Sequence, residues 1–473
     1  MILRYQLRLL VRNGRFLPAI ALFVASFLVA SIAGISRFKT EAHAAAEFDQ
    51  LAREHITRNQ EIARGIEQRI SAGMEKETIP PPFGSRAPNY VYTWCHPAAV
   101  LPPGPLTWMT IGKSDLHPTI FSGPGMTPAE ISSNPLMLWN GYFDLSFVIA
   151  QILPIVIILL TFDLAAGGPS SGVLALTLAQ PISFRRFLLL SILPPAAVVL
   201  GAIVTLIAGA AALSGTSAAS RVGLWLGSAC LYATFWLALS LVVNAVTRSP
   251  QRTAVTLFGA WLTLNLLVPT ASNIVANAIY PIPSRAEFAT FERGLGEQTA
   301  KRDPKAAVEE YIAQHPNYGE TTGLDPQGYR YVVSHAVGEF REGLIETEES
   351  RVQEQRRKQE KLASFLSIIS PATQLMHFMI EISGASDSRR EDFLRQKSKH
   401  LLQYSDYFRP RIYQLPNSIF RSADYDLIPK FRYIEEPVSD VWKRAAVPSG
   451  FLLLLAVLAS GAAARVLAGG IQS

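Results

Sequence analysis

Three short stretches contain residue types that could do chemistry. The first, Gly112-Lys113-Ser114, has the ending of a phosphate-binding loop. Such a loop needs a glycine five residues before its Gly-Lys pair, so that backbone amides can surround the phosphates. Position 107 holds Thr107 instead. The stretch therefore predicts no nucleotide site, and we expect this chain to hydrolyse no ATP by itself.

In the second stretch, a thiol and an imidazole stand side by side between Trp94 and Pro97, in the order WCHP. One cysteine and one histidine provide at most two metal ligands, whereas zinc sites in proteins take four. A packed surface turn is therefore favoured over copper, haem or zinc binding. The other cysteine, Cys230, lies in an apolar run, so no disulfide is expected between the two.

In the third stretch, His335 and Glu339 are four residues apart and would share one face of a helix. No second histidine completes a metallopeptidase motif, so a salt-linked pair is expected instead. His315 is expected in an ordinary turn. No nucleophile, base and acid stand in a pattern typical of catalysis, and the sequence predicts neither catalytic nor metal-binding residues.

The composition indicates a membrane protein. Of the 473 residues, 49% are hydrophobic and 17% are charged, whereas soluble domains contain roughly 25% charged residues. The apolar residues gather in runs of the length, about 20 residues, that crosses a bilayer. The net charge of +6 fits cytoplasmic arginines of a membrane protein, and nucleic acid is not an expected partner.

Six segments are apolar enough and long enough to cross a membrane. The predicted spans are 16–36, 141–164, 187–213, 221–246, 253–280 and 445–468. An amphipathic helix at 1–15 is expected to precede them in the cytoplasm. The first span is not expected to be a signal peptide, because its apolar run is too long and no clean cleavage site follows.

Arginine placement sets the expected orientation, since cytoplasmic loops carry an excess of basic residues. The arginines before the first span are Arg4, Arg8, Arg12 and Arg15, and those of the short loops on the same side are Arg185, Arg186, Arg248 and Arg252. Both termini are then cytoplasmic. Segments 37–140 and 281–441 would face outward as two periplasmic domains.

Both outward segments are expected to be mainly helical. In the first, apolar residues recur near helical spacing from Phe48 to Ile70, which predicts a helix that rises from the membrane. Pro80-Pro81-Pro82 would end it. In the second, charged helix formers from Glu339 to Leu366 predict a solvated helix, with a partner-binding surface as the alternative.

Four stretches carry a resemblance to a known family. They read IGKSDLHP (111–118), NPLMLWNGYFDLSFVIAQILPIVIILLTFDL (134–164), LAQPISFRRFLL (178–189) and SPATQLMHFMIEISGASDSRREDF (370–393). With the predicted topology, they resemble the permease subunits of ABC-2 type transporters. The most similar branch has six spans and two large periplasmic insertions and is associated with multicopper-enzyme maturation and gliding. The resemblance implies an all-α membrane protein with the ABC-2 (type V exporter-like) transmembrane fold, in the bacterial inner membrane.

The same resemblance implies the permease of an ATP-driven exporter or extractor. Its implied partners are separate ABC ATPase subunits, which carry the ATP and Mg, and a second permease, which is expected to be unlike this one. Membrane lipids and an optional periplasmic partner are also implied. No cofactor is expected on this chain itself. The alternative is an ABC-like complex that does not transport but passes ATP-driven movement outward to regulate a periplasmic partner.

In such permeases the loop between spans two and three docks in a groove on the ATPase, and here this coupling segment is 165–186. Glycines and a proline permit a tight reversal, aliphatic side chains form an apolar surface, and two arginines anchor at lipid headgroups. These residues are Gly168, Gly172, Val173, Leu174, Leu176, Leu178, Pro181, Arg185 and Arg186, with Arg248 and Arg252 in a second cytoplasmic loop. An ordinary interfacial loop is the alternative.

The coupling segment departs from the family pattern, because GGPSSGVLAL lacks the usual acidic and basic residues. Either the contact with the ATPase is apolar, or this chain is the weaker partner in a pair of unlike permeases. We favour the second explanation.

Residues of the fifth span, three of them polar, are candidates to line a path through the membrane. They are Thr263, Asn265, Pro269, which is expected to kink the span, and Asn273. Interhelical hydrogen bonding is an equally weighted alternative. An apolar cavity between spans two and five would favour the transport function, whereas closely packed spans would favour the function of transmitting movement. Asp144 is expected to cap the second span at its outer end.

Overall fold

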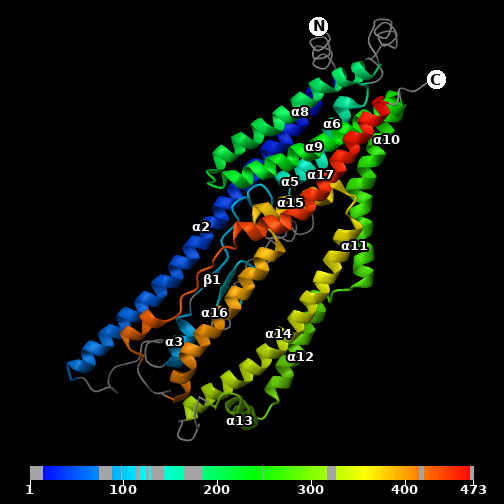
Figure 1. The fold of residues 1–473 in the computed structure, drawn as a ribbon. Coiled ribbons are helices and arrows are strands. Elements are labelled where there is room, and N and C mark those ends of the chain that lie inside the picture. The colour runs from blue at the N-terminus through cyan, green and yellow to red at the C-terminus, as the bar shows by residue number, and fades with distance from the viewer. Residues whose placement is uncertain are drawn as a thin grey trace.

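In the computed structural model, most of the chain is helical (Figure 1). The described residues are 14–73, 88–96, 98–112, 118–123, 127–128, 143–164, 184–247, 249–316, 326–414 and 420–468. Within these ranges, five helices are long and apolar enough to cross a membrane, and the apolar helix Leu145–Thr161 is shorter. The chain is thus an all-α membrane protein.

The apolar helices form one bundle, in which α2 begins and α17 ends at the same end (Figure 1). We call this end the foot, although it is drawn at the top of Figure 1, and the opposite end of the bundle the head. The foot holds Arg15, Asp163, Arg186 and Ser249. The bundle consists of α2 (Phe16–Ser71), α5 (Leu145–Phe147), η2 (Val148–Ile152), α6 (Leu153–Thr161), α8 (Phe184–Ser214), α9 (Ala219–Thr247), α10 (Pro250–Leu262), η4 (Thr263–Leu267), α11 (Val268–Ile279) and α17 (Val438–Ala468).

Helix α9 lies at the centre of the bundle. It packs against α6, α8, α10 and α17, and it buries Trp225, Tyr232 and Trp236 completely. Lipid chains are as apolar as these side chains, so close packing and hydrogen bonds, rather than exclusion of water, hold such helices together. The segment α10–η4–α11 is the least buried of the long apolar helices and presents most of its surface outward.

Helix α2 continues far beyond the bundle as one uninterrupted helix of 56 residues. At 1.5 Å per residue this is about 84 Å, against about 30 Å for the hydrocarbon core of a bilayer. Phe23 and Phe27 pack in the bundle, while Ile56 and Ala63 pack in a separate cluster with the outer helices. The predicted helix rising from the first span is therefore continuous with that span, and it ends at Ser71, before the three prolines.

Two of the spans contain a π-helical turn, which the sequence did not predict. The turn η2 joins α5 to α6, and the turn η4 joins α10 to α11. The kink expected at Pro269 stays a prediction, and the fifth span contains a π-turn that ends at Leu267, two residues before that proline. Helix α17 also begins at Val438, earlier than the predicted last span.

The remaining helices extend from the head in two arms, one with α3, α16 and η6 beside the outer part of α2 and one with α12, α13 and α14, and the arms meet at their far ends in one hydrophobic core (Figure 1). The elements are α3 (Pro88–Trp94), α12 (Arg285–Ala300), α13 (Pro304–Gln314), α14 (Pro326–Leu366), α16 (Asp387–Gln414) and η6 (Ser422–Leu427). Short strands β1 (Ala99–Val100), β2 (Ile120–Ser122) and β3 (Thr127–Pro128) form a small antiparallel sheet in the order β1-β2-β3. The expectation of mainly helical outer domains holds in the described residues, apart from this sheet.

Helix α15 (Pro371–Ser383) joins the outer region to the bundle, because it packs against α9 and α17. The Ser370 hydroxyl caps its first turn by accepting a hydrogen bond from the backbone of Thr373, 3.2 Å away. Gly384 ends the helix with φ of 76°, a left-handed conformation that favours glycine. Its apolar face, with Leu375 and Phe378, belongs to the same hydrophobic core as the spans.

Candidate functional site

Most of the predicted coupling segment lies outside the described residues. This applies to Gly168, Gly172, Val173, Leu174, Leu176, Leu178 and Pro181, and to Arg248 of the second loop. The backbone of Arg185 belongs to α8, and Arg186 and Arg252 are exposed at the foot. The docking role of this segment therefore stays a prediction, whereas the helix ends that hold it can be described.

The foot joins four helices through polar contacts. The Arg15 guanidinium lies 3.3 Å from Asp163 and 4.6 Å from the ring centre of Phe162, and so ties the start of α2 to the end of α6. The Asn244 side chain of α9 donates to the carbonyl of Thr161, 2.9 Å away. The turn between α9 and α10 is closed by a hydrogen bond between the hydroxyls of Thr247 and Thr253. A loop that leaves α6 at this end is therefore anchored, through α6, to α2 and α9.

A second polar site lies within the bundle and arises from a proline. In an α-helix the carbonyl of Ala150 would accept from the backbone of residue 154, but Pro154 has no N–H to donate. A buried carbonyl without a donor is costly in a membrane. Here Ala150 accepts instead from the hydroxyl of Tyr232, at 2.7 Å, and from the side-chain amide of Asn265, at 2.9 Å. We call Ala150, Tyr232 and Asn265 the carbonyl node.

The carbonyl node brings the two π-turns together. Ala150 lies in η2 and Asn265 in η4, and each stands four residues before a proline, Pro154 or Pro269. A proline ring collides with the carbonyl four residues earlier in a regular helix, which accounts for the local widening at both places. Asn265 also donates to Tyr232, at 3.1 Å. Spans two, four and five are thus joined at one carbonyl.

Removing both donors of the carbonyl node should destabilise the bundle by more than the two single changes together. Either Tyr232→Phe or Asn265→Leu leaves Ala150 one donor and should cost about 0.6 kcal/mol. The double variant leaves this buried carbonyl without either side-chain donor, at up to about 3 kcal/mol. Unfolding in mixed detergent micelles would measure this, with Thr234→Val as control, because Thr234 bonds only within α9. Additive losses would contradict the shared-acceptor geometry.

A third site is a buried non-helical segment at the head, residues 102–112, which we call the wedge segment. Its Leu106, Trp108 and Met109 are completely buried. The carbonyl of Thr107 accepts from Arg37 of α2 at 3.0 Å, and the hydroxyl of Thr110 accepts from Trp225 of α9 at 2.9 Å. The segment therefore fills the head between these two helices.

The wedge segment also contacts the second span and the outer helices. Asp144 caps α5, as predicted, by accepting from the backbone of Phe147 at 2.8 Å, and its other oxygen accepts from Ile111 at 2.9 Å. The backbone of Leu106 donates to Ser383 at the end of α15, and the carbonyl of Pro102 accepts from Arg389 of α16 at 3.0 Å. One short segment thus connects three spans with α15 and α16.

Comparison with known families fits this architecture. Residues 1–459 match the family model described as ABC-2 family transporter protein. The chain belongs to this family. Comparison with curated proteins gives no significant match. The chain is accordingly an ABC-2 permease, a membrane component of an ABC transporter and not its catalytic component.

In this ABC-2 permease the predicted path residues of the fifth span do not share one environment. Asn265 is buried and hydrogen-bonded between helices, which is the alternative the sequence left open. Thr263 and Asn273 are exposed on the outside of this single chain, and Pro269 is half-buried. Where the second and fifth spans meet at the carbonyl node they are in direct contact.

Cys95 of the permease occupies a different environment from the predicted surface turn. Cys95 is completely buried, among Val91, Tyr404 and Phe408. Burial raises the pKa of its thiol to about 12, against the smaller opposing effect of a hydrogen bond with Tyr425. The sequence missed this because the residues that cover Cys95 come from α16 and the region after it. Among the described residues, no cluster of three potential metal ligands occurs.

Cys95 should therefore resist thiol reagents in the folded permease. A maleimide reacts with the thiolate, which is scarce when the pKa is about 12, and the side chain has no exposed surface. We expect little labelling of Cys95 over a time in which an introduced cysteine, Leu402→Cys on an exposed position of α16, reacts completely. Both should react in denaturant. Rapid labelling of Cys95 in native protein would contradict the packing described.

The predicted salt-linked pair of His335 and Glu339 is wrong. Glu339 forms an ion pair with Arg409 of α16 instead. His335 stacks near Tyr92 and Tyr311, and burial, with the nearby Arg409 charge as a smaller cause, lowers its pKa to about 4. The imidazole is therefore neutral at pH 7. A spacing of four showed that the two side chains could share a helix face, but not which side chains would approach from α16.

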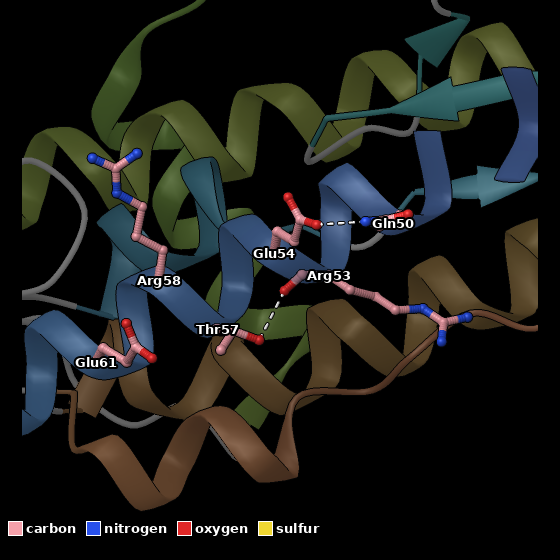
Figure 2. Close-up of a pocket in the computed structure, with 6 residues that line it drawn as sticks. All are labelled: Gln50, Arg53, Glu54, Thr57, Arg58 and Glu61. Atoms are coloured by element: carbon pink, nitrogen blue, oxygen red, sulfur yellow. Dashed lines mark hydrogen bonds between the residues drawn. The ribbon is translucent and has the colours of Figure 1, made fainter. Parts of the chain in front are cut away.

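A shallow hollow lies on the charged face of α2 (Figure 2). Its lining residues are Gln50, Arg53, Glu54, Thr57, Arg58 and Glu61, all of α2, and its volume is about 520 Å³. Neighbours one turn apart satisfy one another, as in the hydrogen bond from Gln50 to Glu54 at 2.7 Å. This is the pattern of a solvated helix face, and it offers no set of converging groups for a ligand.

Proposed function

We propose that this ABC-2 permease is one half of a membrane complex in which separate ATPase subunits drive export or extraction of a substrate at the bacterial inner membrane. The observation that carries the proposal is the foot. There the ends of four helices are held together by Arg15–Asp163, Asn244–Thr161 and Thr247–Thr253. A force applied to the coupling segment would therefore act on α2, α6 and α9 together. The second permease is expected to supply a less divergent coupling segment.

The proposal requires the foot to face the cytoplasm, where ATP is available. A reporter protein fused after Ser473 tests this directly. Activity of a reporter that folds only in the cytoplasm supports the orientation, and activity of a reporter that functions only in the periplasm would refute it. The arginines of the foot predict the first outcome.

Assembly with an ATPase is the second requirement. Co-expression of the permease with a candidate ABC ATPase subunit, followed by detergent extraction and affinity purification through the permease, should recover both chains. The isolated permease should show no ATP hydrolysis above a vector control. Robust hydrolysis by the permease alone would overturn the assignment of roles.

Transmission of movement without transport is a second candidate, favoured by two observations. Spans two and five are in contact at the carbonyl node, whereas transport would predict an apolar cavity between them. The wedge segment fills the head between α2 and α9. A distance measurement by paired spin labels on the two outer arms, with and without ATP, separates the candidates. An ATP-dependent change without any substrate supports transmission, and a change that needs a lipid or peptide substrate supports transport.

A further inference from the structure

The two outer arms are joined at their far ends by one hydrophobic core. We call the arm with α3 and α16 beside α2 the first arm, and the arm with α12, α13 and α14 the second arm (Figure 1). Nearer the head, an exposed ion pair at 2.6 Å joins Arg357 of α14 to Glu391 of α16. The shared core includes Ile56, Ala63, Val91, Tyr404, Phe408 and Ile412 from the first arm, and Val308, Tyr311, Val332 and Ala336 from the second. A group that titrates at this core would therefore affect whether the far ends stay joined.

His335 is such a group, because it lies where the two arms meet. It belongs to α14 of the second arm, and its ring centre is 5.4 Å from that of Tyr92, in α3 of the first arm. The ring of Tyr311 in α13 stacks near it at 6.4 Å, and Tyr92 in turn stacks on Tyr404 of α16 at 5.4 Å. The His335 side chain is partly buried, and its Nε2 atom is completely covered. The imidazole thus packs among aromatic rings of both arms.

The charged groups around His335 come from the same elements and favour its neutral form. Arg409 of α16 has a buried guanidinium, which joins the arms through its ion pair with Glu339 of α14. Asp406 binds the same guanidinium at 3.0 Å. His315, directly after α13, also opposes a positive charge on His335. Both carboxylates are engaged by Arg409, so a proton on His335 would add a second positive charge beside a guanidinium.

The direction of the pKa shift gives the pH range in which this matters. Burial and, as a smaller cause, the Arg409 charge lower the pKa of His335 to about 4, whereas a histidine in water has a pKa of about 6.5. Separated arms, in which the ring reaches water, would therefore bind the proton more readily than joined arms. The stability that neutral His335 gives to the joined arms is complete above about pH 6.5 and is lost as the pH falls toward 4.

We propose that His335 is an acid-sensitive switch of the contact between the two arms, and that its protonation separates the far end of the second arm from the first. The neutral ring packs between Tyr92 and Tyr311, whereas the charged ring beside Arg409 is stable only in contact with water. Acid on the head side of the membrane then shifts the permease from joined to separated arms. The second arm stays attached at the head, where α14 packs against α11 and precedes α15.

Distances between paired spin labels on the purified full-length permease in lipid nanodiscs test the proposal. Labels are placed on exposed positions of the two arms, at Leu402→Cys in α16 and Glu309→Cys in α13. The background is Cys230→Ala, and labelling is done at pH 7.5, where Cys95 is buried. Lowering the pH from 7.5 to 5.5 should raise the ratio of separated to joined arms about tenfold, because pH 5.5 is one unit below the pKa of a histidine in water. An unchanged distance distribution would overturn the proposal.

Variants at two histidines assign the response. His335→Phe keeps an aromatic ring but binds no proton, so its distances should be the same at both pH values. His335→Gln, which is polar and does not titrate, should also lose the response, and it replaces His335→Phe if that variant does not fold. His43→Phe is the matched control, because the His43 side chain is 82% exposed on α2, and it should respond like the unaltered permease. Acid-induced separation that persists without His335 would overturn the proposal. The test needs neither ATPase nor substrate, so its outcome is independent of the proposed function.

Discussion

Replacing Leu174 and Leu176 with aspartate should release the ATPase from the permease. If the apolar face of the coupling segment is docked, each aspartate places an unpaired charge in a desolvated contact, at a cost of several kcal/mol. Since about 1.4 kcal/mol corresponds to a tenfold change in affinity, the complex should largely dissociate. Recovery of the ATPase with the purified permease, and stimulation of its hydrolysis, measure the effect.

The matched control places the same charges at the opposite end of the bundle. Leu213 is highly exposed at the head, and Ala219 begins α9 there. Leu213→Asp with Ala219→Asp should leave the ATPase bound. Full binding and stimulation with aspartates at 174 and 176 would show that the segment is an ordinary loop, and that contact runs through the second loop or the N-terminal helix.

The second large effect is expected from adding one methyl group to α2. A side chain at Gly34 would overlap the backbone carbonyl of Trp108 in the wedge segment, and no flexible neighbour can move aside. Helix propensity alone favours Gly34→Ala by up to about 1 kcal/mol. The collision should outweigh this and destabilise the permease by about 1–3 kcal/mol, as overpacking commonly does. Unfolding in detergent is the measurement.

Gly201→Ala in α8 is the control, because no atom lies within 4 Å of its added Cβ. It should be neutral or stabilising. Gly104→Ala should resemble Gly34→Ala, since its Cβ would lie 2.6 Å from the carbonyl oxygen of Gly384. If Gly34→Ala and Gly201→Ala unfold alike, the wedge segment does not pack against α2 as described.

The features that could be predicted from the sequence depend on neighbours in the chain. Apolar runs predicted membrane helices, helical spacing from Phe48 to Ile70 predicted the outer part of α2, and the position of Asp144 predicted a helix cap. Each of these depends on spacing within one element. The family followed from motifs that are likewise continuous in the sequence.

The features that were missed depend on segments far apart in the chain. Cys95 is buried by side chains from α16, and Glu339 is paired with an arginine about 70 residues later in the sequence. The carbonyl node shows the same limit. Pro154 by itself indicates that the carbonyl of residue 150 has no α-helical donor four residues later. Only the fold shows that the side chains of Tyr232 and Asn265 donate to it instead.

The continuity of α2 has a mechanical consequence. The helix begins beside Asp163 at the foot, and near its other end Glu67 accepts hydrogen bonds from the backbone and hydroxyl of Ser422, both at 2.7 Å. With no loop between these points, the helix acts as a lever about 84 Å long. A tilt of about 3° at the foot would displace the far end of a rod of that length by about 4 Å. A small rearrangement at the foot would thus produce a larger displacement at the outer end of α2, without any break in the helix itself.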